Sequence, residues 1–426
     1  MLDLKFIREN PEVVREAARK KRSDLPLDEL LELDNQVMRE RQEIQELREQ
    51  QNRVSRAVRD AATSAEKQSL IAQGRALGDE ISQRENQLKA EDDRLQALLL
   101  RVPNIPDESV PEGNGEEENV AIRHWGEPPH FDFEPRDHVT LMERLDMLDI
   151  ARGARIAGSR SYILKNAGAL LEFALIRFAL DKVRAKGFTP LIVPALTREA
   201  PLVGTGQFPT GRDQIYELPK DDLFLVGTAE VAMTGMYAGE ILPYADLPIK
   251  MVAVSPCFRR EAGSFGRDVR GVMRVHQFTK VEQYVICEND AVASLEWLEI
   301  LLQNAEEIVQ ALELPYRVML VCTGDMGDGK VKSYDIECWV PSEGRYRETH
   351  SDSALYDWQA RRVNVRYRDE TGKVRHVHTL NNTALASPRI MVPLLENNQQ
   401  ADGSIRVPTA LQPYLGMERI EVRQLR

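Results

Sequence analysis

Residues 28–99 restrict the fold of this chain more than any other stretch. They are rich in Glu, Gln, Arg and Leu, contain no proline, and hold only two glycines, Gly74 and Gly78. One heptad position is occupied by Leu30, Val37, Ile44, Gln51 and Val58. The other seam position is occupied by Leu33, Leu47 and Val54 and is interrupted by Glu40. A second heptad register contains Leu77, Ile81, Leu88, Leu95 and Leu98. Since small residues at 61–64 separate the two registers, the pattern predicts an antiparallel α-helical coiled-coil hairpin over about 28–99. Each helix of about 35 residues would be roughly 50 Å long.

Three arginines recur near the predicted tip of this hairpin. Arg53, Arg56 and Arg59 are three residues apart, so they lie along one helix face. One interpretation is a solvated stripe that pairs with acids of the preceding turns, such as Glu46 and Glu49. The other is a set of phosphate contacts to a folded RNA, whose shape such contacts recognise.

The sequence around the hairpin indicates two domains. Residues 1–25 read as a short helix, for which Asn10, Pro11 and Glu12 supply the start. Proline, glycine and acidic residues then gather after Arg101, as in a solvated linker. We expect an N-terminal helical arm at 1–105, a linker at 106–120 and a second domain at 121–426. With strands and helices in the second domain, the fold class is α+β.

Charge and cysteine usage narrow the class of protein. A net charge of -12 argues against non-specific coating of nucleic acid and leaves room for local basic patches. The four cysteines are far apart and form no C-x-x-C pair, so reduced, mostly buried thiols and no structural zinc are expected. With no apolar run of membrane-spanning length and no signal-peptide core, we expect no membrane association and a cytoplasmic protein.

The chemistry concentrates between Ser255 and Tyr284. Alternating apolar and polar residues predict two strands, and glycines interrupt the basic loop between them. Arg259 and Glu261 share one parity on the first strand, as do Arg274, His276, Phe278, Lys280 and Glu282 on the second. These side chains would therefore project from one face of a sheet.

Residue types suggest what this face binds. A guanidinium such as Arg259 suits a phosphate, the carboxylate of Glu261 can accept from the amine of adenine, and Phe278 can stack on the base. The alternative is an exposed hairpin with cross-strand ion pairs. The whole set favours a nucleotide site.

The motif F-R-R-E, followed by a loop and R-V-H-Q-F-x-K-V-E, resembles motif 2 of the class II aminoacyl-tRNA synthetases, in the form of the seryl-tRNA synthetases. This resemblance implies a catalytic domain built on an antiparallel β-sheet flanked by helices. It also implies that the N-terminal arm, with Arg53, Arg56 and Arg59, binds the long variable arm of tRNA.

Other segments resemble the same family. A helix at 168–185, a strand and Pro194 resemble motif 1, which implies a homodimer; the alternative is a core helix packed on its own sheet. The T-x-E element at Thr228 and Glu230 resembles the amino-acid pocket, whereas without the family these are ordinary turn residues. The segment H-T-L-N-N-T-A-L-A-S-P-R, at 378–389, resembles motif 3, where Arg389 meets the γ-phosphate.

The resemblance implies specific site residues. Arg259 and Arg389 would be catalytic, and the serine contacts would be Thr228, Ala229, Glu230, Glu282 and Thr383. Contacts to ATP would come from Arg259, Arg260, Glu261, Arg274, Val275, Phe278, Glu348, Thr349, His350, Ser351 and Arg389. Glu348 and Ser351 would bind Mg²⁺ together with ATP. The chain departs from the common pattern at His350, Asp352 and Asn382, of which the last stands where glycine is usual.

The resemblance implies ATP-dependent, AMP-forming ligation of L-serine to tRNA(Ser), and also to tRNA(Sec). The cofactors would be ATP and Mg²⁺. Two alternatives remain at this point. The chain could load an acceptor other than tRNA, or it could be an inactive paralogue that only binds RNA.

Overall fold

The computed structural model describes residues 1–263, 266 and 270–421. Contacts divide the chain into two compact units. The helical unit contains residues 2–19 and 23–102, and the sheet unit contains residue 1, residues 20–22 and residues 103–426. Residues 264–265 and 267–269, at the centre of the predicted basic loop, lie outside the described residues.

The helical unit consists of four helices. They are α1 (Leu4–Glu9), α2 (Pro11–Lys20), α3 (Leu27–Asp60) and α4 (Ser64–Leu99). The single helix predicted over 1–25 is therefore two helices. Pro11 is the first residue of α2, because a proline, which lacks a backbone N–H, fits the first turn of a helix but not its interior.

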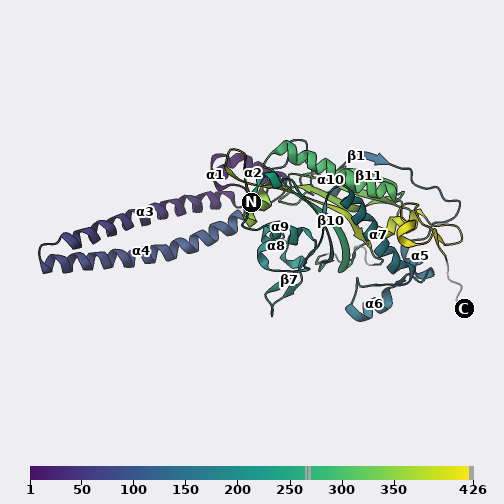
Figure 1. Ribbon diagram of the computed structural model, residues 1–426, viewed down its shortest axis with the longest axis horizontal. Coiled ribbons are helices and arrows are strands. Elements are labelled where there is room, and N and C mark those ends of the chain that lie inside the picture. The colour runs from purple at the N-terminus through teal and green to yellow at the C-terminus, as the bar shows by residue number, and fades with distance from the viewer. Residues whose placement is uncertain (264–265, 267–269, 422–426) are drawn as a thin grey trace. The chain divides into compact units, whose positions relative to one another are not determined.

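Helices α3 and α4 pack side by side as the predicted hairpin (Figure 1). The heptad residues Leu30, Val37 and Ile44 of α3 and Ile81 and Leu95 of α4 are buried. Ion pairs between the helices, such as those from Arg41 to Asp92 at 2.8 Å and from Arg48 to Glu85 at 2.6 Å, are exposed and add little stability. The apolar seam therefore supplies most of the stability of the hairpin.

The sheet unit is built on eight strands in the order β1-β11-β12-β13-β16-β10-β9-β4. Their bounds are β1 Val120–Trp125, β4 Thr189–Ile192, β9 Ile249–Phe258, β10 Gln277–Cys287, β11 Tyr316–Leu320, β12 Lys332–Val340, β13 Arg345–Ala354 and β16 His378–Ser387. All neighbours are antiparallel except β4 and β9, which are parallel. The predicted antiparallel sheet is confirmed.

Shorter elements complete the sheet unit. The short strands are β2 Leu148–Asp149, β3 Ile163–Leu164, β5 Leu196–Thr197, β6 Glu217–Leu218, β7 Leu223–Leu225, β8 Ile241–Pro243, β14 Arg366–Arg368, β15 Val374–His376, β17 Ile405–Arg406 and β18 Arg419–Ile420. The helices are α5 His138–Arg144, α6 Ile150–Ala157, α7 Ala167–Ala185, α8 Glu199–Thr205, α9 Glu230–Met236, α10 Ala291–Ala311, α11 Trp358–Val363, α12 Met391–Asn397 and α13 Gln412–Leu415.

Each face of the large sheet packs on different helices (Figure 1). On one face, Val281 and Val285 of β10 join the main core with residues of α7 and α10. On the other face, Tyr284 and Ile286 join a smaller core with residues of α9 and α11. Because successive side chains of a strand point to opposite faces, β10 contributes to both layers.

The region that resembles motif 1 leaves apolar side chains exposed. Phe173 on α7 is 71% exposed, and Ile192 on β4 is 95% exposed. Strand β4 is also the last strand of the large sheet, with no partner on its outer side among the described strands. An apolar helix face beside an open sheet edge is typical of an interaction surface.

Two further sequence expectations can be compared with the structure. All four cysteines are buried and free, as predicted. No helix in the described part of the chain is long and apolar enough to cross a membrane.

Candidate active site

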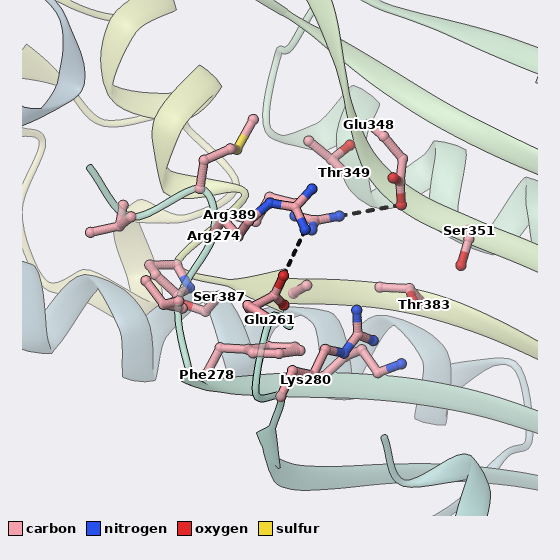
Figure 2. A pocket seen from close by; sticks show the side chains of 16 residues that line it. Glu261, Arg274, Phe278, Lys280, Glu348, Thr349, Ser351, Thr383, Ser387 and Arg389 are labelled. Carbon is pink, nitrogen blue, oxygen red and sulfur yellow. Dashed lines mark hydrogen bonds and ion pairs between the residues drawn. The ribbon is translucent and has the colours of Figure 1, made fainter. Parts of the chain in front are cut away.

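A cleft opens over β10, β13 and β16, on the face opposite to α7 and α10. Its first part is lined mainly by the predicted nucleotide residues. Those of the predicted set that line it are Arg259, Glu261, Arg274, Val275, Phe278, Glu348, Thr349, Ser351, Thr383 and Arg389. Figure 2 shows Arg274, Arg389 and Glu348 on one side of this part, facing Phe278 and Lys280 on the other.

The strands that carry motif 2 are shorter than predicted. Strand β9 ends at Phe258 and β10 begins at Gln277, so Arg259, Glu261 and Arg274 lie in the loop between them. Glu261 has a φ of 53°, a left-handed conformation that ends the extended chain. Strand parity therefore does not explain why these residues share a face, although the loop still brings them into the cleft.

Contacts within the loop orient its charged groups. The guanidinium of Arg259 lies over the ring of Phe278, 5.2 Å from its centroid, and its Nε donates to the carbonyl of Gly227 at 3.4 Å. Arg274 donates to Glu261 at 2.6 Å. These contacts fix the Arg259 guanidinium over the Phe278 ring and the Glu261 carboxylate against Arg274, and all four residues line the first part of the cleft. A cation, a ring and a carboxylate in one cleft are groups that an adenine nucleotide can use.

A β-bulge on β13 places Glu348 and Ser351 on the same face. Residues three apart on a regular strand point to opposite sides. On β13, however, Ile336 pairs with His350 and the next residue of β12, Glu337, pairs with Glu348, so Thr349 is an extra residue. Both Glu348 and Ser351 consequently line the cleft, and Arg389 lies 3.2 Å from the Glu348 carboxylate.

Strand β16 contains a second bulge beside the first. Val281 of β10 pairs with Leu385 and Glu282 pairs with Thr383, which leaves Ala384 as the extra residue. Thr383 and Ala386 both line the cleft for this reason. Two neighbouring strands thus carry bulges where they border the site, as is common next to active sites.

The second part of the cleft is lined by Thr228, Glu230 and Glu282, and it shares Arg259, Lys280 and Ser351 with the first. The Glu230 carboxylate accepts hydrogen bonds from Gln359 at 2.8 Å and Asn381 at 2.9 Å. Burial, followed by the charge of Glu282, raises the pKa of Glu230. Glu230 is half-buried and Glu282 is buried, and the ammonium group of Lys280 pairs with Glu282. The two carboxylates therefore carry one more negative charge than Lys280 balances, which favours a bound cation such as an ammonium group.

Some predicted residues do not line the cleft. Ala229 is fully buried in the core next to the second part, and Arg260 is exposed. His350 is 1% exposed, and its Nδ1 lies 2.8 Å from the hydroxyl of Thr349. The three hairpin arginines belong to the helical unit; Arg53, Arg56 and Arg59 are exposed there, and none has an ion pair within the described part of the chain.

The residues that depart from the family pattern point away from the cleft. Asp352 of β13 lies opposite Asn382 of β16, and both are buried. The Oδ1 of Asn382 accepts from Gln283 at 2.7 Å, and Gln283 accepts from Asn304 of α10 at 2.8 Å. The side chain of Asn382 therefore extends toward α10, so the absence of a glycine at this position adds no atoms to the cleft.

Sequence reasoning missed several residues that line the second part or hold its walls. Lys280, which shared parity already places on the face of Phe278 and Glu282, has no predicted role, although it lines both parts of the cleft. Gln359 and Asn381, which hydrogen bond to Glu230, carry no motif signal of their own. The loop 324–330 forms one wall, and only its two aspartates and three glycines mark it as a loop.

Glu348 and Ser351 fit a hard cation. One carboxylate and one hydroxyl face the cleft from the same side of β13, and oxygen ligands are those that Mg²⁺ takes. Within the described residues no cluster of three or more His, Cys, Asp or Glu side chains could hold a metal by itself. Such a pair would bind Mg²⁺ together with substrate phosphates, which is the usual mode for this ion.

Comparison with known proteins identifies the family. Residues 1–106 match the family model "Seryl-tRNA synthetase N-terminal domain", and residues 215–398 match "tRNA synthetase class II core domain (G, H, P, S and T)". A serine–tRNA ligase of Deinococcus radiodurans is 54% identical over 416 residues, covering 98% of both chains. The chain belongs to the seryl-tRNA synthetases. The resemblance drawn from motifs 1, 2 and 3 is confirmed.

Solved structures of seryl-tRNA synthetases agree with the fold described above. The enzyme from Pyrococcus horikoshii, crystallised with ATP, is 42% identical with a TM-score of 0.93, over 100% of both chains. The cytoplasmic enzyme from Naegleria fowleri, in complex with AMP, is 29% identical with a TM-score of 0.87, over 100% of this chain and 99% of that one. Both of these relatives carry an adenine nucleotide.

Proposed function

We propose that the cleft activates L-serine with ATP and then transfers it to the 3′ end of tRNA(Ser), and also of tRNA(Sec). The observation that carries this proposal is the continuity of the cleft. The part lined by the predicted nucleotide residues and the part lined by the carboxylates of Glu230 and Glu282 meet at Arg259 and Lys280, which line both. A carboxylate held at the second part would therefore approach a phosphate held at the first.

In the first step, the carboxylate of serine attacks the α-phosphorus of ATP and pyrophosphate leaves. Phe278 would stack on adenine, Glu261 would accept from its amine, and Arg389 would meet the γ-phosphate. Arg259 would contact the α-phosphate, because it lies between the two parts of the cleft. The negative charge that develops on the phosphate oxygens is stabilised by these guanidinium groups, so no protein nucleophile is required.

Glu348 and Ser351 would hold Mg²⁺, which neutralises phosphate charge when it is bound. At the other end, Glu230 and Glu282 would receive the ammonium group of serine. A carboxylate there provides a charge-assisted hydrogen bond of roughly 1.5–3 kcal/mol. Thr383 lines the first part but pairs with Glu282 across β10 and β16, and from there it would accept from or donate to the serine hydroxyl. Alanine, which lacks that hydroxyl, would then leave a buried polar group unpaired.

In the second step, a hydroxyl of the terminal ribose of tRNA attacks the carbonyl of the seryl-adenylate, and AMP leaves. Arg53, Arg56 and Arg59 would contact tRNA phosphates from the helical unit, which supports recognition by shape. The exposed Phe173 and Ile192 support a homodimer through the motif 1 region. We place the protein in the cytoplasm, because its substrates are found there and its four thiols are free.

Serine-dependent exchange between ATP and pyrophosphate tests the first step. Arg259→Ala should abolish this exchange and leave tRNA binding intact. Arg345→Ala is the matched control, because Arg345 belongs to the same sheet but its side chain is 63% exposed and outside the cleft. Exchange near the wild-type rate in Arg259→Ala would refute the role of that residue.

A charging assay tests the second step. Replacing Arg53, Arg56 and Arg59 together by alanine should lower kcat/KM for tRNA and leave ATP–pyrophosphate exchange unchanged. Arg41→Ala is the control, because Arg41 lies on the same helix and pairs with Asp92. Unaltered charging by the triple variant would overturn the assignment of the arm.

A further inference from the structure

The loop 324–330 forms a wall of the part of the cleft that we assign to serine. It connects β11 to β12, and all seven of its residues line that part together with Thr228, Glu230 and Glu282. At its start Met326 packs with Val110 and Val321, and the Asp325 carboxylate accepts a hydrogen bond from Asn119. Two of the remaining residues, Gly327 and Gly329, have no side chain to anchor them. The second half of this wall therefore depends on contacts to its backbone.

Four successive carbonyl groups of the loop accept hydrogen bonds from two distant residues. The ammonium group of Lys21 donates to the carbonyls of Gly327 at 3.3 Å, Asp328 at 2.8 Å and Lys330 at 2.5 Å. The side-chain amide of Asn104 donates to Gly329 at 3.0 Å, and its backbone amide donates to Asp328 at 2.7 Å. These two residues account for the carbonyls from 327 to 330.

Lys21 is suited to this task only in its charged form. An ammonium group has three donors, which here match three carbonyl acceptors, whereas a neutral amine has two donors and a lone pair that would face a carbonyl oxygen. The Lys21 side chain is 6% exposed. Burial lowers the pKa of Lys21 to about 7, the nearby Asp328 raises it, and Lys330 lowers it.

We propose that Lys21, in its charged form, is a positioning residue that holds the loop 324–330 in place and so sets the affinity of the cleft for serine. This proposal rests on the assignment of the second part of the cleft to serine. Lys21 touches no substrate and acts through the loop. Both anchors flank the hairpin helices in sequence, since Lys21 precedes α3 and Asn104 follows α4.

The test measures KM for serine and for ATP by ATP–pyrophosphate exchange in Lys21→Met and Lys21→Arg. Loss of hydrogen bonds from a charged donor should raise KM for serine about tenfold in Lys21→Met. KM for ATP should stay at its wild-type value, and Lys21→Arg should recover most of the serine affinity. Lys20→Met is the control, because Lys20 is partly exposed and its ammonium group lies 4.0 Å from Glu112.

The pH dependence gives a second, independent measurement. As pH rises from 6 to 8, Lys21 loses its proton, so KM for serine should rise in the wild type and should not rise in Lys21→Met. Burial raises the pKa of Glu230. Protonation of this carboxylate would raise KM for serine as pH falls, which is the opposite pH dependence to that expected from Lys21. The two titrations are therefore distinguishable by direction.

Each outcome decides one of the two assignments. An unchanged KM for serine in Lys21→Met, or an equal rise in KM for serine and ATP, would overturn the role of Lys21. If Lys21→Met does not fold, a wild-type KM for serine that is flat from pH 6 to 8 would overturn it instead. A wild-type protein without serine-dependent exchange would refute the proposed function, and not the anchoring of the loop.

Discussion

The side chain of His350 is buried outside the cleft, and its titration can be measured. The family resemblance predicts that His350 contacts ATP, whereas the structure buries it behind β13 with its Nδ1 2.8 Å from the Thr349 hydroxyl. Burial lowers the pKa of His350 to about 4 from the usual 6.5. The perturbation that we choose is His350→Gln, which keeps a polar side chain of similar size but does not titrate.

The size of the effect follows from linkage. Between pH 6.5 and pH 4 the unfolded chain binds a proton at this histidine and the folded chain does not, so stability falls as pH falls. At pH 5, which is about 1.5 pH units below the pKa of the unfolded histidine, the free energy of unfolding is lowered by roughly 2 kcal/mol. Burial also lowers the pKa of His378 to about 4. This histidine destabilises the folded state at low pH by a similar amount, and it does so equally in the wild type and in His350→Gln.

The assay is urea unfolding of wild type and His350→Gln at pH 7 and pH 5, together with KM for ATP at pH 7. We expect the variant to gain roughly 2 kcal/mol relative to the wild type on going from pH 7 to pH 5. KM for ATP should be unchanged. If the wild type and His350→Gln differ in stability by the same amount at both pH values, His350 is not a buried neutral histidine. A large rise in KM for ATP would show that His350 contacts ATP.

Three further variants test other parts of the proposal. Glu348→Gln removes a carboxylate that would bind Mg²⁺, so the Mg²⁺ concentration for half-maximal exchange should rise at least about tenfold; an unchanged requirement would exclude this ligand. Glu230→Gln should raise KM for serine about 10- to 100-fold through loss of a charge-assisted hydrogen bond, and exchange kinetics at wild-type KM would contradict the role. Phe173→Glu puts a charge on the exposed apolar surface of α7, so light scattering should detect monomers in place of dimers; a persistent dimer would locate the interface elsewhere.

Much of this architecture could be predicted from the sequence. Heptads between Leu30 and Leu98 are long enough to specify a helical hairpin, because periodicity over many turns is a strong signal. The motifs identified Arg259, Phe278 and Arg389 as cleft residues, since residue type and spacing are linked to one chemistry. A sequence therefore reveals features that are encoded within one continuous segment, such as a heptad repeat or a motif.

What the sequence did not reveal depends on pairing between distant strands. The bulge at Thr349 is visible only from the register of β12 against β13, and it decides that Glu348 and Ser351 share a face. The resemblance predicts a contact between His350 and ATP, but a match in position says nothing about which side of the strand the side chain takes. The anchoring of the loop 324–330 by Lys21 joins segments that are about three hundred residues apart, and no local pattern encodes such a contact.

Strand β10 divides two tasks between alternate positions. Its even-numbered residues Phe278, Lys280 and Glu282 line the cleft, while Val281 and Gln283 contact the helix layer behind the sheet. Substitutions at Lys280 and Glu282, which line the second part, can therefore change which amino acid is accepted, whereas Tyr284 and Ile286 further along the same side belong to the smaller core and must be kept. Substitutions at Val281 and Gln283 would instead disturb the packing against the helices and leave the choice of amino acid unchanged. A design that aims at a new amino-acid substrate should therefore vary only the cleft-facing side of β10.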